Sequence, residues 1–252
     1  MRENLVTSKI AKGENVPGVF IDLDSSAAAE GMAHAGYGFL LVDLQHGVID
    51  TRSAVSILTA ISTTDCMPFV RVPGNEPAAI MQALDFGAMG VVCPLINTAD
   101  QAARFVDAMR YPPQGSRSWG PFRAAIYAGE NYTQEANDTL MAIAQIETKE
   151  AMDNLDAILA TPGLDGVLVG PNDLGFSYGN WPQAMPEDPQ VVEAIKTIAA
   201  KCRDHGVIPG IHSGDAAMAR QMFDWGYRFS TISTDMGLMI KAAKESLAAL
   251  EG

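Results

Sequence analysis

Short runs of apolar and β-branched residues alternate with stretches of helical periodicity along the whole chain. Eight runs indicate strands: Gly18–Leu23, Gly38–Leu44, Pro68–Val72, Gly90–Leu95, Met141–Ile146, Gly166–Val169, Val207–Ile211 and Phe229–Ser233. The helical patterns cover Ser25–Ala35, Thr51–Ser62, Pro77–Phe86, Ala99–Met109, Lys149–Leu159, Pro189–His205, Asp215–Trp225 and Gly237–Leu250. Continuous apolar strands are typical of a sheet buried on both faces, and the helices provide the crossovers that parallel strands need. The alternation therefore predicts a parallel α/β fold.

Eight strand–helix pairs within 252 residues match the count and size of a (β/α)8 TIM barrel. A doubly wound sheet usually has fewer strands and often a glycine-rich phosphate turn after the first one, where this chain has Asp22-Leu-Asp-Ser-Ser26. No linker divides the sequence, so we predict a single barrel domain over residues 1–252. Two connections, over residues 111–137 and 176–188, are longer than usual and are expected to be lids, binding loops or subunit contacts.

Composition excludes several classes of function. The net charge of −13 disfavours binding to nucleic acids or to anionic membranes, both of which require basic patches. The sequence contains no apolar run long enough to span a membrane, and its first residues lack the apolar core of a signal peptide. Its three cysteines include no CxxC pair, so we expect reduced, buried thiols and a cytoplasmic location.

Polar side chains gather where the predicted strands end. In a barrel the active site is built at the carboxyl ends of the strands. Asp43, Gln45 and His46 follow the second strand, Arg71 the third, Gln145 and Glu147 the fifth, Asn172 and Asp173 the sixth, and His212 and Ser213 the seventh. Ionisable groups from several strands should therefore converge on one face of the barrel.

Glu147 and Asp173 are the candidate metal ligands. Carboxylates from neighbouring strand ends suit a hard cation such as Mg²⁺ or Mn²⁺, which keeps several waters and needs only one or two protein carboxylates. Taken singly, each residue could instead cap a helix or a turn. Their occurrence as a pair at adjacent strand ends favours the metal site.

His46 and Arg71 are the candidate residues for proton transfer and charge stabilisation. Asp43 is close enough in sequence to hold one ring nitrogen of His46, which would fix its tautomer and raise its basicity. Arg71 could bind a carboxylate or stabilise an enolate oxygen. The alternative for Arg71 is an ion pair with Asp85 or Glu76.

Five segments resemble the signatures of the HpcH/HpaI aldolase family, which includes metal-dependent class II pyruvate aldolases such as 4-hydroxy-2-oxoheptanedioate aldolase. The segments are Asp43-Leu-Gln-His46-Gly, Phe69-Val-Arg71-Val, Tyr111-Pro-Pro-Gln-Gly-Ser-Arg117, Ala144-Gln-Ile-Glu147-Thr and Gly170-Pro-Asn-Asp173-Leu. They occur in the family's order and cover nearly the whole chain. The resemblance implies a (β/α)8 barrel that assembles as a homo-oligomer, a hexamer built as a trimer of dimers, with the last helix exchanged between subunits.

The resemblance also implies roles for individual residues. Glu147 and Asp173 would bind Mg²⁺ or Mn²⁺, with Co²⁺ or Zn²⁺ as further candidates, and Arg71 would steady the enolate. Further expected roles are as follows: Gln145 binds the keto acid, backbone amides near Pro171, Asn172 and Asp173 hold its carboxylate, His46 with Asp43 transfers protons through water, and Asp85 is a second acidic residue near that pair. Three residues depart from the family pattern: Gln45 replaces Glu, His212 replaces an aliphatic residue, and Phe20 replaces Trp in the pocket wall. His212 and Phe20 are expected to contact the substrate, with His212 reaching the aldehyde or a hydroxyl of the donor, and the alternative for His212 is a buried structural histidine.

The sequence thus predicts a class II aldehyde-lyase that makes or cleaves 4-hydroxy-2-keto acids from pyruvate or hydroxypyruvate and an aldehyde, through an enolate stabilised by a divalent metal. Lys149, the one lysine near the expected site, should face outward, so a Schiff-base mechanism is not expected. An acyl-CoA lyase like citrate lyase is the alternative, with Arg117, Arg123 and Lys149 as its only candidate basic groove. A non-catalytic binding protein has no need of a metal site combined with a base.

Overall fold

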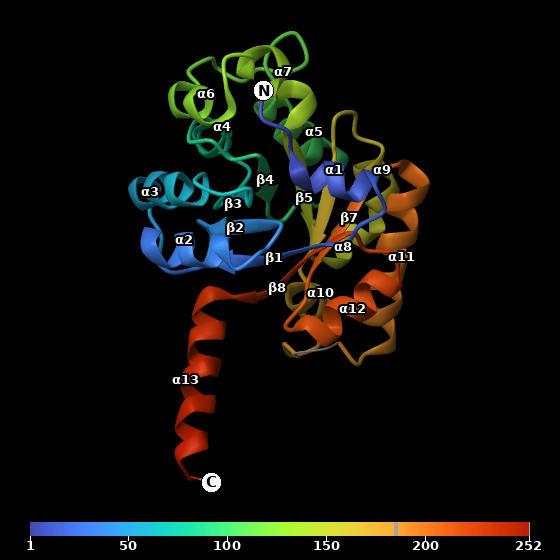
Figure 1. Ribbon diagram of the computed structural model, residues 1–252. Helices are drawn as coiled ribbons and strands as arrows, with labels where there is room; N and C mark the ends of the chain where they lie inside the picture. The colour runs from blue at the N-terminus through green and yellow to red at the C-terminus, as the bar shows by residue number, and fades with distance from the viewer. Residues whose placement is uncertain (184–185, 252) are drawn as a thin grey trace.

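Eight parallel strands form a closed barrel in the computed structural model, which describes residues 1–183 and 186–251 (Figure 1). The strands are β1 (Val16–Ile21), β2 (Phe39–Asp43), β3 (Met67–Arg71), β4 (Gly90–Cys93), β5 (Met141–Ile146), β6 (Gly166–Val169), β7 (Ile208–His212) and β8 (Phe229–Thr234). Each strand pairs with its neighbours in sequence, and β8 pairs with β1 to close the barrel. The predicted (β/α)8 fold is confirmed.

Helices surround the barrel, and several begin at a side-chain cap. The main ones are α2 (Ser26–His34), α3 (Thr51–Ile61), α4 (Pro77–Asp85), α5 (Ala99–Met109), α11 (Pro189–His205) and α12 (Ala216–Asp224). Ser25, Asp50, Thr98, Asp188 and Asp215 each accept a hydrogen bond from an amide of the first turn that follows. These bonds satisfy amides that have no partner within the helix, so the caps define where each strand–helix connection ends.

An aromatic layer fills the amino-terminal end of the barrel. The rings of Phe39 and Phe69 lie 5.2 Å apart, and those of Phe39 and Phe229 lie 5.8 Å apart. At Gly90, a Cβ atom would lie 2.9 Å from the Phe69 ring, so glycine is what admits the ring there. Because side chains fill this end of the barrel interior, a pocket within the barrel can open toward the carboxyl ends of the strands.

The structure contains helices that the sequence patterns did not predict. Residues 111–137, expected as a loop, include α6 (Phe122–Ala128) and most of α7 (Tyr132–Thr139), and two further helices are α1 (Leu5–Ala11) and α10 (Pro171–Ser177). The helix predicted over Lys149–Leu159 is instead two, α8 (Lys149–Asp153) and α9 (Leu155–Leu159). They separate at Asn154, whose side-chain amide donates to the Asn97 carbonyl. Residues 184 and 185 of the second predicted long loop lie outside the described residues.

The last helix, α13 (Asp235–Glu251), extends away from its own barrel (Figure 1). Four of its apolar side chains are between 45% and 84% exposed: Met239, Ile240, Leu247 and Leu250. None of the helices in the described part of the chain has the length and apolar character needed to cross a bilayer. The prediction of buried thiols is confirmed, since Cys66, Cys93 and Cys202 are all buried and free.

Candidate active site

A pocket of about 210 Å³ opens at the carboxyl ends of the strands. It is lined by Phe20, Asp22, Asp43, His46, Arg71, Gln145, Leu168, Val169, Gly170, Pro171, Asn172, Asp173, His212 and Thr234. All but two of the residues that were assigned a role in the site from the sequence line this pocket. Of those two, Glu147 lies against Gln145 and Gly170 of the lining, and Asp85 lies elsewhere.

The Glu147 carboxylate is buried and held on both oxygens. Oε1 accepts a hydrogen bond of 2.8 Å from the Leu95 amide, and Oε2 accepts one from the side-chain amide of Gln145. Leu95 adopts a left-handed backbone with φ of 55°, which costs on the order of 1–3 kcal/mol for a residue other than glycine. The cap of α8 is Thr148, so the alternative role of Glu147 as a helix cap is wrong.

Glu147 and Asp173 raise the question of whether a divalent cation fits between them. Burial raises the pKa of Glu147, and the nearby Asp173 carboxylate raises it further. The hydrogen bonds from Gln145 and Leu95 lower this pKa and offset part of the rise. A cation would relieve this desolvation and repulsion. The buried Gln145 Oε1, which has no hydrogen-bond partner among the described residues, adds an oxygen acceptor beside Glu147. The described residues contain no group of three or more metal-binding side chains, and a Mg²⁺-type ion needs only two carboxylates.

Asp43 is paired with Arg71 rather than with His46. The Arg71 side chain donates to both carboxylate oxygens, at 2.8 Å from Nε and 2.6 Å from Nη2, and the Gln45 amide donates to Oδ1 at 3.0 Å. The expected contact between Asp43 and the His46 ring is therefore absent from the described hydrogen bonds, and His46 lies exposed at the pocket mouth. The alternative pairing of Arg71 with Asp85 or Glu76 is also wrong.

Asp85 lies apart from the pocket. It is the last residue of α4 and forms an ion pair of 2.8 Å with the fully buried Arg117. Because α4 follows β3 and runs back along the barrel, its last turn lies at the amino-terminal end of the strands. Within this chain, Asp85 is thus a partner of Arg117 rather than a neighbour of His46.

His212 forms one side of the pocket with Phe20. Its Nδ1 lies 2.9 Å from the Thr231 hydroxyl, and its ring meets the Phe20 ring edge-on at 5.3 Å. The Arg71 guanidinium lies 4.6 Å above the Phe20 ring. Burial lowers the pKa of His212 to about 4, and the Arg71 charge contributes. His212 is therefore neutral near pH 7.

Two of the pocket residues with polar side chains, Asp22 and Thr234, were not predicted. Asp22 directly follows β1, so the rule that found the other strand-end residues applies equally to it. Its backbone amide donates to the Asp235 carboxylate at 2.9 Å, as does that of Leu23 at 3.3 Å. Burial raises the pKa of Asp22 to about 6, with contributions from Asp43 and Asp235.

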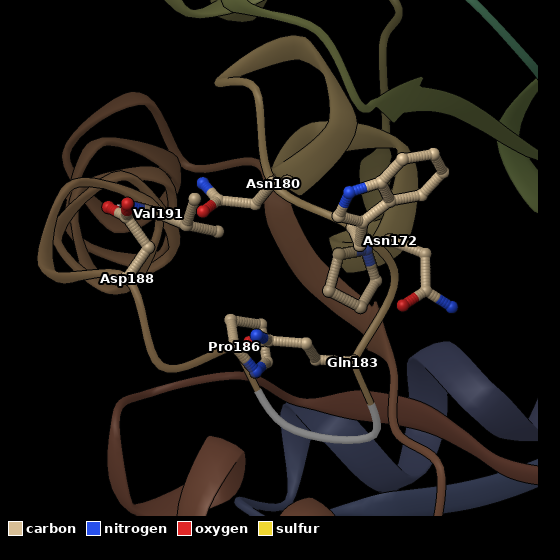
Figure 2. A pocket seen from close by; sticks show the side chains of 9 residues that line it. Asn172, Asn180, Gln183, Pro186, Asp188 and Val191 are labelled. Atoms are coloured by element: carbon tan, nitrogen blue, oxygen red, sulfur yellow. Dashed lines mark hydrogen bonds between the residues drawn. The ribbon is translucent and has the colours of Figure 1, made fainter.

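A much smaller cavity of about 10 Å³ lies beside the main pocket, between α10 and the start of α11. It shares Pro171 and Asn172 with the main pocket. In Figure 2 the side chains of Asn180 and Val191 lie toward Asp188, whereas that of Asn172 points away from them. This space is about the size of a single water probe, so it serves as packing at the base of the loop rather than as a ligand site.

The model of the family described as HpcH/HpaI aldolase/citrate lyase matches residues 17–242 of this chain. The chain belongs to this family. A hydroxypyruvate/pyruvate aldolase from Rhizorhabdus wittichii is 35% identical over 229 residues, covering 91% of each protein. A 4-hydroxy-2-oxo-heptane-1,7-dioate aldolase from Escherichia coli is 36% identical over 99% of this chain and 95% of that protein. A crystal structure of a family member from Burkholderia cenocepacia superposes with a TM-score of 0.92 at 35% identity, over 99% of this chain and 100% of that one.

The citrate-lyase side of the HpcH/HpaI family is more distant. The citrate lyase beta subunit of Mycobacterium tuberculosis has a TM-score of 0.60 at 15% identity over 89% of this chain, a likeness that extends to the fold alone. The basic groove considered for an acyl-CoA is not assembled either. Arg117 is buried against Asp85, and Arg123 donates to Thr59, Ser62 and the Phe86 carbonyl, away from the pocket.

Proposed function

We propose that this chain is a class II, divalent-metal-dependent aldolase that makes or cleaves 4-hydroxy-2-keto acids from pyruvate or hydroxypyruvate and an aldehyde. The observation that carries the proposal is the buried Glu147 carboxylate, which two donors fix near Asp173 and directly behind Gln145 and Gly170 of a pocket that also contains the cation of Arg71. The named activities of the two aldolase relatives support the same chemistry.

The residues around Glu147 would bind the keto acid. When bound by Glu147 and Asp173, Mg²⁺ or Mn²⁺ (or Co²⁺ or Zn²⁺) supplies Lewis-acid polarisation that makes the hydrogens next to the carbonyl more acidic. Gln145 and the first amides of α10, at Asn172 and Asp173, are placed to hold the keto acid's carboxylate, because amides of a first helical turn lack partners within the helix.

Arg71 and His46 would divide the handling of charge and protons. Arg71 is oriented by its two bonds to Asp43, so its planar cation can stabilise the developing enolate oxygen without reorganising. His46 at the pocket mouth can take up the keto acid's proton through a water and return a proton to the new alkoxide. Asp43 contributes to the stabilisation of the enolate, because it positions Arg71.

We also propose that the protein is a homo-oligomer, a hexamer assembled as a trimer of dimers, with α13 exchanged between paired subunits. The exposed apolar residues of α13, which its own barrel leaves uncovered, support the exchange. The cytoplasmic location stays a prediction.

The experiment that tests the function is proton–deuterium exchange at the methyl group of pyruvate and the hydroxymethyl group of hydroxypyruvate. We expect exchange that is abolished by EDTA and restored by a metal from a panel of Mg²⁺, Mn²⁺, Co²⁺ and Zn²⁺. Glu147→Gln should remove most of the exchange while circular dichroism stays that of the folded protein. Full exchange by Glu147→Ala in the presence of chelator would contradict the proposal, and turnover of acyl-CoA esters instead of free keto acids would favour the lyase alternative.

A further inference from the structure

The pocket has a second polar wall that the keto-acid chemistry does not use. Glu147 follows β5, and in a closed barrel of eight sequential strands β5 lies opposite β1. Asp22 follows β1, and Thr234 and His212 close the neighbouring strands β8 and β7. We name Asp22, Thr234 and His212 the β1 wall. A keto acid held at Glu147 leaves the space before this wall for the second reactant.

Each member of the β1 wall is held in place by its own bonds. The Asp235 carboxylate fixes the backbone amide of Asp22 at 2.9 Å. The Thr234 hydroxyl accepts from the Gly237 amide at 2.9 Å, which leaves its hydrogen to donate toward Asp22. His212 uses Nδ1 at the Thr231 hydroxyl, which leaves Nε2 for a ligand. These side chains are therefore preorganised, and little ordering is needed when a partner binds.

The charge on this wall is negative, and the Arg71 cation offsets only part of it. Among the described residues Asp22 has no ion pair, and its charged neighbours include the carboxylates of Asp43 and Asp235. The Arg71 cation nearby is already committed to Asp43 through two hydrogen bonds. A second carboxylate brought to this wall would be repelled, whereas a hydroxyl group can donate to Asp22 and bond to the neutral His212 ring.

Resting on the aldolase function proposed above, we propose that the β1 wall is the acceptor subsite and that Asp22 selects aldehydes carrying a hydroxyl group next to the carbonyl over aldehydes carrying a carboxylate there. The substrate class is thus short hydroxyaldehydes. The hydrogen bond from the aldehyde's hydroxyl to the Asp22 carboxylate should make a hydroxyaldehyde a better acceptor, by about tenfold or more in kcat/KM, than an aldehyde without the hydroxyl.

The test compares three acceptors of two carbons each: glycolaldehyde, acetaldehyde and glyoxylate. Initial rates of addition to pyruvate give kcat/KM for each, and every variant's values are expressed relative to its own pyruvate exchange rate. We expect the protein to prefer glycolaldehyde over acetaldehyde by about tenfold or more and to use glyoxylate least. Asp22→Ala should reduce the glycolaldehyde preference to about twofold or less, and Asp22→Asn should keep part of it while improving the use of glyoxylate.

Asp24→Asn is the matched control, since Asp24 is an exposed carboxylate two residues away whose described hydrogen bond is to Ser53, outside the pocket. It should leave all three relative values unchanged. An unchanged acceptor preference in Asp22→Ala overturns the subsite while the aldolase function stands. A parallel loss of exchange and addition in both Asp22 variants assigns Asp22 to enolisation and overturns the subsite as well. Absence of exchange in the unmodified protein with metal rejects the aldolase function and the subsite with it.

Discussion

Replacing Gly170 with alanine tests how strictly the barrel holds the Glu147 carboxylate. A Cβ atom at position 170 would lie 2.8 Å from Glu147 Oε2 and 3.3 Å from Gln145 Nε2. Ordinary contacts begin at about 3.4 Å, so the carboxylate oxygen must retreat by about 0.6 Å. Because the Leu95 amide holds the other oxygen at 2.8 Å, this movement lengthens at least one hydrogen bond to a buried charge.

The expected cost of Gly170→Ala follows from that bond. A hydrogen bond to a charged group contributes about 1.5–3 kcal/mol, and a protein of this size loses about 2–4 °C of Tm per kcal/mol, so Tm should fall by roughly 3–12 °C. Mn²⁺ binding should weaken by about 10–100-fold, the effect typical of a disturbed residue behind a metal site. Thermal unfolding in EDTA and a Mn²⁺ titration followed by electron paramagnetic resonance measure the two quantities.

Gly175→Ala is the control for this prediction. Its Cβ atom would lie 3.9 Å from the Asn180 Cβ, an ordinary contact, and it stands within α10, where alanine is favourable. It should leave Mn²⁺ binding unchanged and Tm equal or higher. If Gly170→Ala also kept both the Tm and the Mn²⁺ affinity of the unmodified protein, the reasoning that Glu147 is rigidly tethered beside a metal would be refuted.

Three further predictions concern groups that burial perturbs. Burial raises the pKa values of Cys66, Cys93 and Cys202 to about 12. A thiol reagent at pH 8 should therefore leave the native protein unlabelled and modify all three cysteines in denaturant, and labelling of the native protein would contradict this prediction. Burial lowers the pKa of His212 from its usual 6.5 to about 4. Between these two pH values the unfolded chain binds a proton at His212 and the folded protein does not, so the free energy of unfolding should fall as the pH drops from about 6.5 to about 4. Urea unfolding across that range should show a smaller fall in His212→Gln, and an equal fall in both would assign the pH dependence to other groups. Asp85→Asn should destabilise the fold by about 3 kcal/mol, since it leaves the buried charge of Arg117 unpaired, and urea unfolding of the variant with an unchanged midpoint would disprove that.

The sequence predicted the barrel well because its strands are continuous apolar runs and because strand ends place polar residues on one face. The site's pairings were harder to predict. Asp43 and Arg71 are 28 residues apart in sequence but are direct partners in the register of β2 and β3, so their ion pair depends on an alignment that periodicity does not contain. The hydrogen bond from Leu95 to Glu147 could not be predicted for another reason: its donor is a backbone amide, which nearly any residue type could supply.

The sequence patterns did not predict α6 and α7, and the reason differs from that for the site's pairings. Phe122 and Ile126 of α6 are exposed rather than turned to the core, so the segment lacks the apolar stripe that marks the other helices. Asp22 was missed although the strand-end rule includes it, because it belongs to no motif and its importance depends on lying opposite Glu147 across the closed barrel.

Asp235 links the outward helix to the acceptor side of the pocket. It is the first residue of α13, and its carboxylate is also what holds the amides of Asp22 and Leu23. If subunits associate through α13, both subunit association and acceptor binding depend on the position of the Asp235 carboxylate. The two equilibria are therefore linked. Dilution that dissociates subunits would weaken acceptor binding, and a saturating acceptor would strengthen assembly by the same factor.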